Sequence, residues 1–82
     1  MLLDIPESLV EELTRRYDAY QKAVANYAIR PSALNLTIRN AALGTLNKTV
    51  DKCGVELGQS ITPRPDVVPQ EDGTLKLLYP TP

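Results

Sequence analysis

The fold is decided by a break and a long apolar stretch between residues 30 and 57, which read RPSALNLTIRNAALGTLNKTVDKCGVEL. Pro31 pushes Arg30 away from helical geometry, because the proline ring clashes with the residue before it. Ser32 belongs to the residue types that commonly cap the start of a helix. A second helix is therefore expected to begin near Ala33. Since only residues 30–32 connect it to the helix before it, the two helices should lie antiparallel as a helical hairpin.

The second helix is expected to run from Ala33 to Cys53 or to Leu57, with Gly54 or Gly58 as its C-terminal cap. Its apolar positions form two neighbouring stripes, which cover an arc of roughly 200° on a helical wheel, about twice the usual width. The main stripe comprises Leu36, Leu43, Leu46, Val50, Cys53 and Leu57, and the second comprises Leu34, Ile38, Ala41 and Ala42. One neighbouring helix cannot cover so wide an arc, so we expect the C-terminal segment or another chain to pack there.

The first helix is predicted from about Asp4 to Arg30. Asp4 and Glu7 have the spacing of a capping box, and Pro6 falls in the first turn, where its missing N–H is tolerated. One side of the helix carries apolar and aromatic residues at intervals of three and four, namely Val10, Leu13, Tyr17, Tyr20, Val24 and Tyr27. Acid–base pairs four residues apart occupy the other side, each worth roughly 0.2–0.5 kcal/mol. They are Glu11–Arg15, Glu12–Arg16 and Asp18–Lys22.

The C-terminal segment, residues 59–82, differs from the rest in being rich in proline. The prolines exclude a helix and restrict any strand to a sheet edge. Two short apolar runs, Val67–Val68 and Leu75–Tyr79, flank an Asp72–Gly73 turn signal, and both a β-hairpin and an extended arm fit this pattern. The sequence thus predicts a mainly α protein with a helical hairpin domain, residues 1–58, and a proline-rich arm.

Chain length and cysteine content favour an oligomer. A chain of 82 residues is small for an independent domain, and such scaffolds are usually stabilised by disulfides, a metal or self-association. Cys53 is the only cysteine and histidine is absent, so we expect neither an intrachain disulfide nor a metal, and no cofactor. The N-terminus does not resemble a signal peptide and no stretch is long enough to cross a bilayer, so a cytoplasmic protein is expected.

The charge of the chain argues against nucleic acid as the main partner. The net charge is −1, and acidic and basic residues are interspersed. We therefore expect no strong basic field that would attract the phosphates of duplex DNA.

Tyrosine supplies every aromatic side chain, and three tyrosines lie on the apolar side of the first helix: Tyr17, Tyr20 and Tyr27. One interpretation is a stacking surface for a base or another flat ligand, with Arg16, Lys22 and Arg30 nearby to meet phosphates. The other, which we favour, is that these tyrosines belong to the core and place their hydroxyls at its rim.

A polar stripe on the second helix contains Asn40, Gly44, Asn47 and Asp51. Glycine costs about 1 kcal/mol in a helix interior, so Gly44 needs a reason. Either another backbone or a ligand approaches it, with Asn40 and Asn47 forming hydrogen bonds across the contact, or the stripe is a solvated face with one tolerated glycine.

No residue pattern indicates catalysis. Cys53 is expected to be a buried structural thiol rather than a nucleophile, and without histidine the usual base for nucleophilic catalysis is missing. We therefore predict that the protein is not an enzyme.

Two functions fit the sequence. The first is a non-enzymatic protein-binding module, an inhibitor or adaptor of the kind that phages and mobile elements encode, which acts as a homo-oligomer. Its expected oligomer interface comprises Leu34, Ile38, Ala42, Leu43, Leu46 and Val50. The alternative is an oligomer that sequesters a nucleotide or cyclic nucleotide between subunits. Its expected ligand-binding residues are Tyr17, Tyr20, Tyr27, Arg16, Lys22, Arg39, Asn40 and Asn47.

Overall fold

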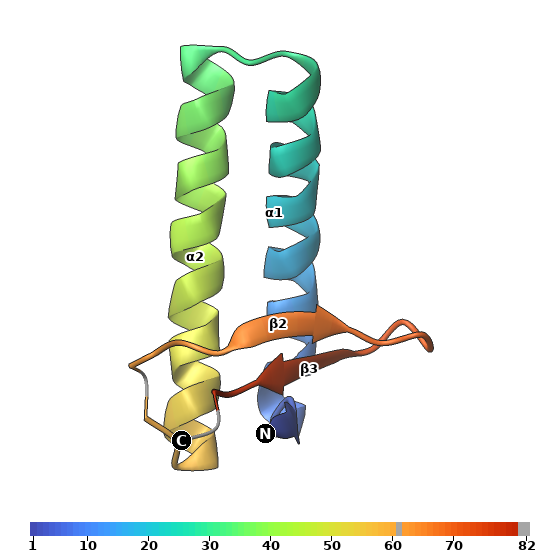
Figure 1. The fold of residues 1–82 in the computed structure, drawn as a ribbon, viewed down its shortest axis with the longest axis vertical. Coiled ribbons are helices and arrows are strands. Elements are labelled where there is room, and N and C mark those ends of the chain that lie inside the picture. The colour runs from blue at the N-terminus through green and yellow to red at the C-terminus, as the bar shows by residue number, and fades with distance from the viewer. Residues whose placement is uncertain (61, 81–82) are drawn as a thin grey trace.

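Two antiparallel helices and a three-stranded sheet make up the structure, a computed structural model that describes residues 1–60 and 62–80. The elements in chain order are β1 (Leu2–Asp4), a 3-10 turn (Glu7–Leu9), α1 (Val10–Ile29), α2 (Ala33–Leu57), β2 (Asp66–Pro69) and β3 (Leu75–Leu78). The helices lie side by side along the long axis of the molecule, and the sheet crosses only one end of them (Figure 1).

The predicted helical hairpin is confirmed, and so are the signals that define its second helix. Ser32 is the N-cap of α2, and its side chain accepts a hydrogen bond of 3.1 Å from the backbone N–H of Asn35. At the other end the helix reaches Leu57, the longer of the two predicted ends. Gly58 follows in the left-handed conformation, with φ of 68°, which is the conformation that favours glycine.

The predicted start of the first helix is wrong. Asp4 is the last residue of β1, and α1 begins only at Val10 after a short 3-10 turn, so Asp4 and Glu7 do not form a capping box. Pro6 precedes that turn with an extended ψ of 134°. The reason is tertiary: residues 2–4 pair with β3, and this pairing outweighs the local tendency to start a helix.

The C-terminal segment forms the β-hairpin, not the extended arm. β2 and β3 pair antiparallel across the predicted turn, where Gly73 has a φ of 88° and Asp72 Oδ1 accepts a hydrogen bond of 3.0 Å from the N–H of Thr74. The strand order is β1-β3-β2, so the proline-containing β2 lies at an edge, as predicted. The third strand, β1, was not predicted.

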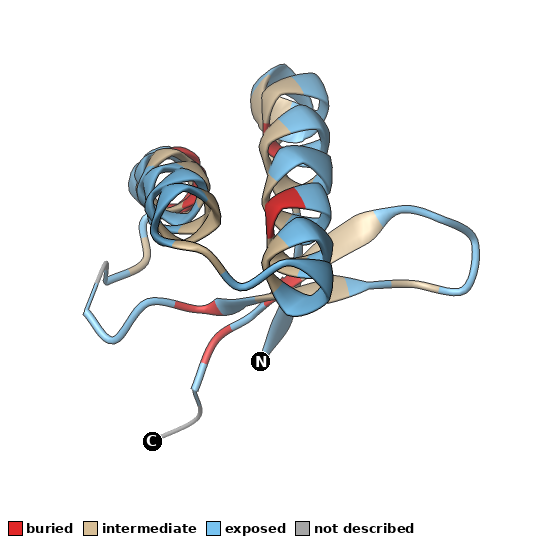
Figure 2. Cartoon of the chain, turned by 90° about the horizontal axis from the view of Figure 1, so that it is seen from above, coloured by how far each residue is buried: buried red, intermediate tan, exposed pale blue. Residues whose placement is uncertain are grey.

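The core lies where the inner face of the sheet meets the lower half of the hairpin. Its buried residues come from both parts of the chain and are Leu13, Leu46, Val50, Cys53, Leu77 and Tyr79. Both helices lie on the same side of the sheet (Figure 2). The C-terminal segment therefore docks on its own chain and covers the part of α2 next to Leu57.

The three acid–base pairs expected along α1 are not formed as ion pairs: within residues 1–60 and 62–80, none has its charged atoms within 4.0 Å. Glu12 instead faces α2. Its carboxylate accepts hydrogen bonds from the Thr49 hydroxyl at 2.9 Å and from the Lys52 ammonium at 3.2 Å. These bonds, that of Thr49 above all, lower the pKa of Glu12. They also satisfy the buried hydroxyl of Thr49, which lies in the helix contact.

Candidate interaction surface

The half of the hairpin farthest from the sheet has several exposed aliphatic side chains. We call residues 21–45 the distal hairpin: they comprise the second half of α1, the connection and the first half of α2. Figure 1 shows this part projecting beyond the sheet. In the described part of the chain, α1 and α2 cover each other here on one side only.

Large aliphatic side chains in the distal hairpin remain in solvent. The exposed fraction is 83% for Ile29, 69% for Leu34, 48% for Ile38 and 37% for Leu43. Leu34 and Ile38 lie four residues apart and therefore on the same side of α2. Single exposed aliphatic residues are common on protein surfaces, but neighbouring exposed aliphatic residues on one side of a helix commonly mark a contact. This segment therefore has more apolar surface than its own chain covers.

The sequence-predicted interface residues divide between this surface and the core. Leu34, Ile38 and Leu43 are exposed, and Ala42 is half-buried. Leu46 and Val50, in contrast, are buried against the sheet and α1 within the same chain. In this structure they are not accessible to a second chain, so only the part of the predicted set nearest Pro31 remains free.

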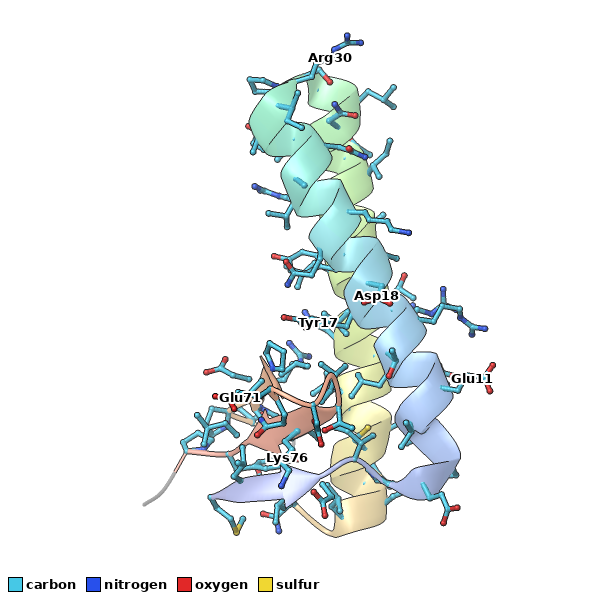
Figure 3. The ribbon with its side chains drawn as sticks, turned by 90° about the vertical axis from the view of Figure 1, so that its right-hand side faces the viewer. Glu11, Tyr17, Asp18, Arg30, Glu71 and Lys76 are labelled. Carbon is cyan, nitrogen blue, oxygen red and sulfur yellow. The ribbon has the colours of Figure 1, made fainter. Side chains whose placement is uncertain are left out.

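The distal hairpin also differs from the rest of the chain in charge. It contains Lys22, Arg30 and Arg39 and no acidic residue, which gives it a charge of +3. All 10 acidic residues and the other six of the 9 basic residues lie outside it, so the remainder of the chain carries −4. Figure 3 shows Arg30 at the far end of the hairpin, whereas Glu11 and Glu71 lie towards the sheet. The expectation that acids and bases are interspersed is therefore wrong at the level of the fold.

Arg39 is held against an aromatic ring. Its guanidinium carbon lies 4.7 Å from the ring centroid of Tyr27, a distance typical of a cation–π contact between the two helices. Two of the predicted ligand-binding residues thus pair with each other. Arg39 is the one charged residue in the sequence from Ala33 to Leu46, and it is half-buried. The contact with Tyr27 thus shields part of its guanidinium from solvent.

A pocket of about 350 Å³ lies where the distal hairpin meets β2. Of the predicted ligand-binding residues it gathers Tyr17, Tyr20 and Asn47. Pro65, Asp66 and Val67 also line it. Tyr17 and Tyr20 pack against the core, as favoured from their positions on the helix.

The remaining predicted ligand-binding residues do not join this pocket. Lys22 lines a shallow surface on the outer side of α1, next to Glu11 and Asp18. Arg16 is half-buried, and its Nε has no hydrogen-bond partner among the residues described. Asn40 is exposed on α2. None of the predicted cations lines the pocket with the tyrosines in the described structure.

Gly44 is exposed, and no contact in the described part of its own chain requires a glycine at this position. A methyl group added at this position would meet no atom within 4 Å in the parts of the chain described. The sequence suggested that another backbone approaches Gly44 closely. Neither α1 nor the sheet makes such an approach in the described structure. Asn47 lies beside the pocket, and Asp51 forms an ion pair with Arg64 at 3.0 Å, so the polar stripe is only partly free.

Cys53 is fully buried in the core. Burial, and then the nearby carboxylates of Glu56 and Glu12, raise the pKa of its thiol to about 11. A thiol in such surroundings is a poor nucleophile.

No group of three or more Cys, Asp or Glu side chains within residues 1–60 and 62–80 has the arrangement of a metal site. None of the helices described there is long and apolar enough to cross a membrane.

Fold and surface together define a helical hairpin. A small antiparallel sheet packs against one end of it, and the other end is apolar and basic. Comparisons of the chain with protein-family models, with curated proteins and with solved structures found no match.

Proposed function

We propose that this chain is a non-enzymatic protein-binding module, which acts by packing its distal hairpin against another protein chain, in the first instance a second copy of itself. As an oligomer it would serve as an adaptor or an inhibitor. The observation that carries the proposal is the exposure of Leu34 and Ile38 on a half-helix with a single charged residue. Apolar patches of this kind commonly mark protein–protein contacts.

The energy available from this surface suits a reversible association. Burying the exposed parts of Ile29, Leu34 and Ile38 would contribute roughly 3–6 kcal/mol from one partner. The partner surface contributes a similar gain, whereas association costs about 4–15 kcal/mol in lost freedom of motion. The gain and the cost are of similar size, so we expect a weak association that depends on concentration.

Substitution of two exposed residues tests the proposal. We predict that the double substitution Leu34→Glu and Ile38→Glu abolishes self-association, because it places two carboxylates in a contact that depends on apolar burial. Both positions are exposed and glutamate is a good helix former, so the monomer should keep its circular dichroism spectrum. Sedimentation equilibrium should give a mass above 9.0 kDa for the unmodified chain and 9.0 kDa for the double variant.

Val55→Glu is the matched control. Val55 is an aliphatic residue of the same helix that is 73% exposed, but it lies at the sheet end. This variant should associate as the unmodified chain does. Equal loss of association in the control and in the double variant would mean that any added charge has this effect, and the proposal would then be wrong.

Sequestration of a nucleotide between subunits has less support. None of its three predicted cations, Arg16, Lys22 and Arg39, lines the pocket beside Tyr17 and Tyr20 in the described structure. It stays a prediction from the sequence.

A further inference from the structure

We infer that copies of this chain associate head to tail, with the distal hairpin of one copy packed against the outer face of the sheet of the next. The inference rests on the proposed function, because it names the surface that receives the distal hairpin. It depends on a second exposed surface at the opposite end of the molecule and on the charges of the two ends.

The outer sheet face is the side of the sheet that the helices do not cover (Figure 2). Side chains alternate along a strand, and Leu3, Val67 and Leu77 point to the core. The residues between them, which are cross-strand neighbours in the register, point outwards. These outer-face residues are Leu2, Asp4, Asp66, Val68, Lys76 and Leu78.

The outer sheet face has an apolar centre with charged residues of both signs around it. Leu2 and Leu78 are directly opposite each other, and their exposed fractions are 47% and 43%. Next to them along the sheet, Asp66 pairs with Leu78 and is exposed. Asp4 forms an ion pair with Lys76 at 3.3 Å, whereas in the described part of the chain Asp66 has no cation within 4.0 Å. One carboxylate therefore remains free beside the apolar centre.

The charges of the two surfaces are complementary. The distal hairpin carries +3 and no acidic residue, and the outer sheet face carries −1, from Asp4, Asp66 and Lys76. In a symmetric contact between two distal hairpins, Arg30 and Lys22 of each copy would approach the same residues of the other, and like charges repel. A contact between the distal hairpin and the outer sheet face brings opposite charges together, with apolar side chains on both sides.

Pairing through the free edges of the sheet is a less suitable route. β2 is an edge strand that has Pro65 before it and Pro69 at its end, and β1 is only three residues long and ends at Asp4. Proline, charge and short length at edge strands all discourage pairing with another chain. The face of the sheet, rather than its edge, is therefore the surface that can receive a partner.

The two surfaces lie at opposite ends of a molecule that is 38 Å long. When unlike surfaces bind each other, every added copy leaves one distal hairpin and one outer sheet face free. The assembly then grows into a chain or closes into a ring. This property gives the inference a test that a symmetric dimer cannot pass.

The test mixes two variants, each of which lacks one surface. The first carries Leu34→Glu and Ile38→Glu in the distal hairpin and keeps its outer sheet face. The second carries Leu2→Ser and Leu78→Ser on the outer sheet face and keeps its distal hairpin; serine adds no charge that could pair with the new glutamates. Each variant alone should have a mass of 9.0 kDa by light scattering, and an equimolar mixture should give twice that mass and nothing larger.

The outcomes separate this inference from the proposed function. If the outer-face variant alone associates as strongly as the unmodified chain, the head-to-tail arrangement is overturned, while binding through the distal hairpin stands. If the distal-hairpin variant also associates, or if the unmodified chain is monomeric at every concentration, the proposed function fails as well. Circular dichroism melting curves of both variants, compared with that of the unmodified chain, ensure that loss of association is not loss of fold.

Discussion

Replacing Leu77 by alanine is expected to destabilise the protein by about 2–5 kcal/mol, a large share of the stability of a small domain. Leu77 is fully buried in the central strand β3, opposite Leu3 on one side and Val67 on the other. Its side chain belongs to the cluster that joins the sheet to Leu13 and Val50 of the helices. Truncation would leave a cavity where all parts of the chain meet. Urea unfolding followed by circular dichroism measures the loss.

Leu78→Ala is the matched control for this prediction. Leu78 is the next residue of the same strand and loses the same atoms, but it lies on the outer sheet face. In dilute solution this variant should lose clearly less stability than Leu77→Ala, because Leu78 is 43% exposed and its truncation leaves no enclosed cavity. Comparable losses at the two positions would show that the sheet does not pack on the helices as described.

Cys53 is expected to react with an aromatic disulfide reagent at least about 100-fold more slowly in the native protein than in the unfolded one. Its pKa rises from 9.0 to about 11, so near neutral pH the reactive thiolate is about 100-fold rarer than in an ordinary thiol. Burial against Leu13 and Tyr79 slows the reagent further. The same chain in concentrated urea provides the reference rate. A native rate within a few-fold of this reference would contradict the buried position of the thiol.

The parts of the fold that could be predicted from the sequence are those set by neighbouring residues. Pro31 and Ser32 fix the break and the start of α2, and Gly58 fixes its end. The Asp72–Gly73 turn fixes the hairpin of β2 and β3. Each of these signals acts within a few residues of the element that it defines, so a single sequence contains it.

The start of the chain could not be predicted in this way. β1 is only three residues long and exists because Leu3 pairs with Leu77, far away in sequence. Locally, Asp4 and Glu7 imitate the beginning of a helix, and nothing nearby contradicts that signal. Pairing with β3 decides between a helix start and a strand at residues 2–4. A search for local patterns does not include this distant partner.

The candidate surface was predicted in part. The width of the apolar arc on α2 correctly indicated that more than one neighbour is needed. Periodicity, however, does not tell which neighbour covers which residue, and Leu46 and Val50 belong to the core of their own chain. The charge difference between the two ends was visible in the sequence, since no acidic residue occurs between Asp18 and Asp51. The nearly balanced total charge concealed it.

Hydroxyl-radical footprinting of the unmodified chain, from dilute to concentrated solution, tests most directly whether the distal hairpin packs against another chain. Val55, which is 73% exposed at the sheet end of α2, is an internal reference within the same helix. We predict that oxidation of Leu34 and Ile38 falls as the concentration rises, while oxidation of Val55 does not change. Oxidation of all three side chains that stays the same at every concentration would contradict a distal hairpin buried by a second copy.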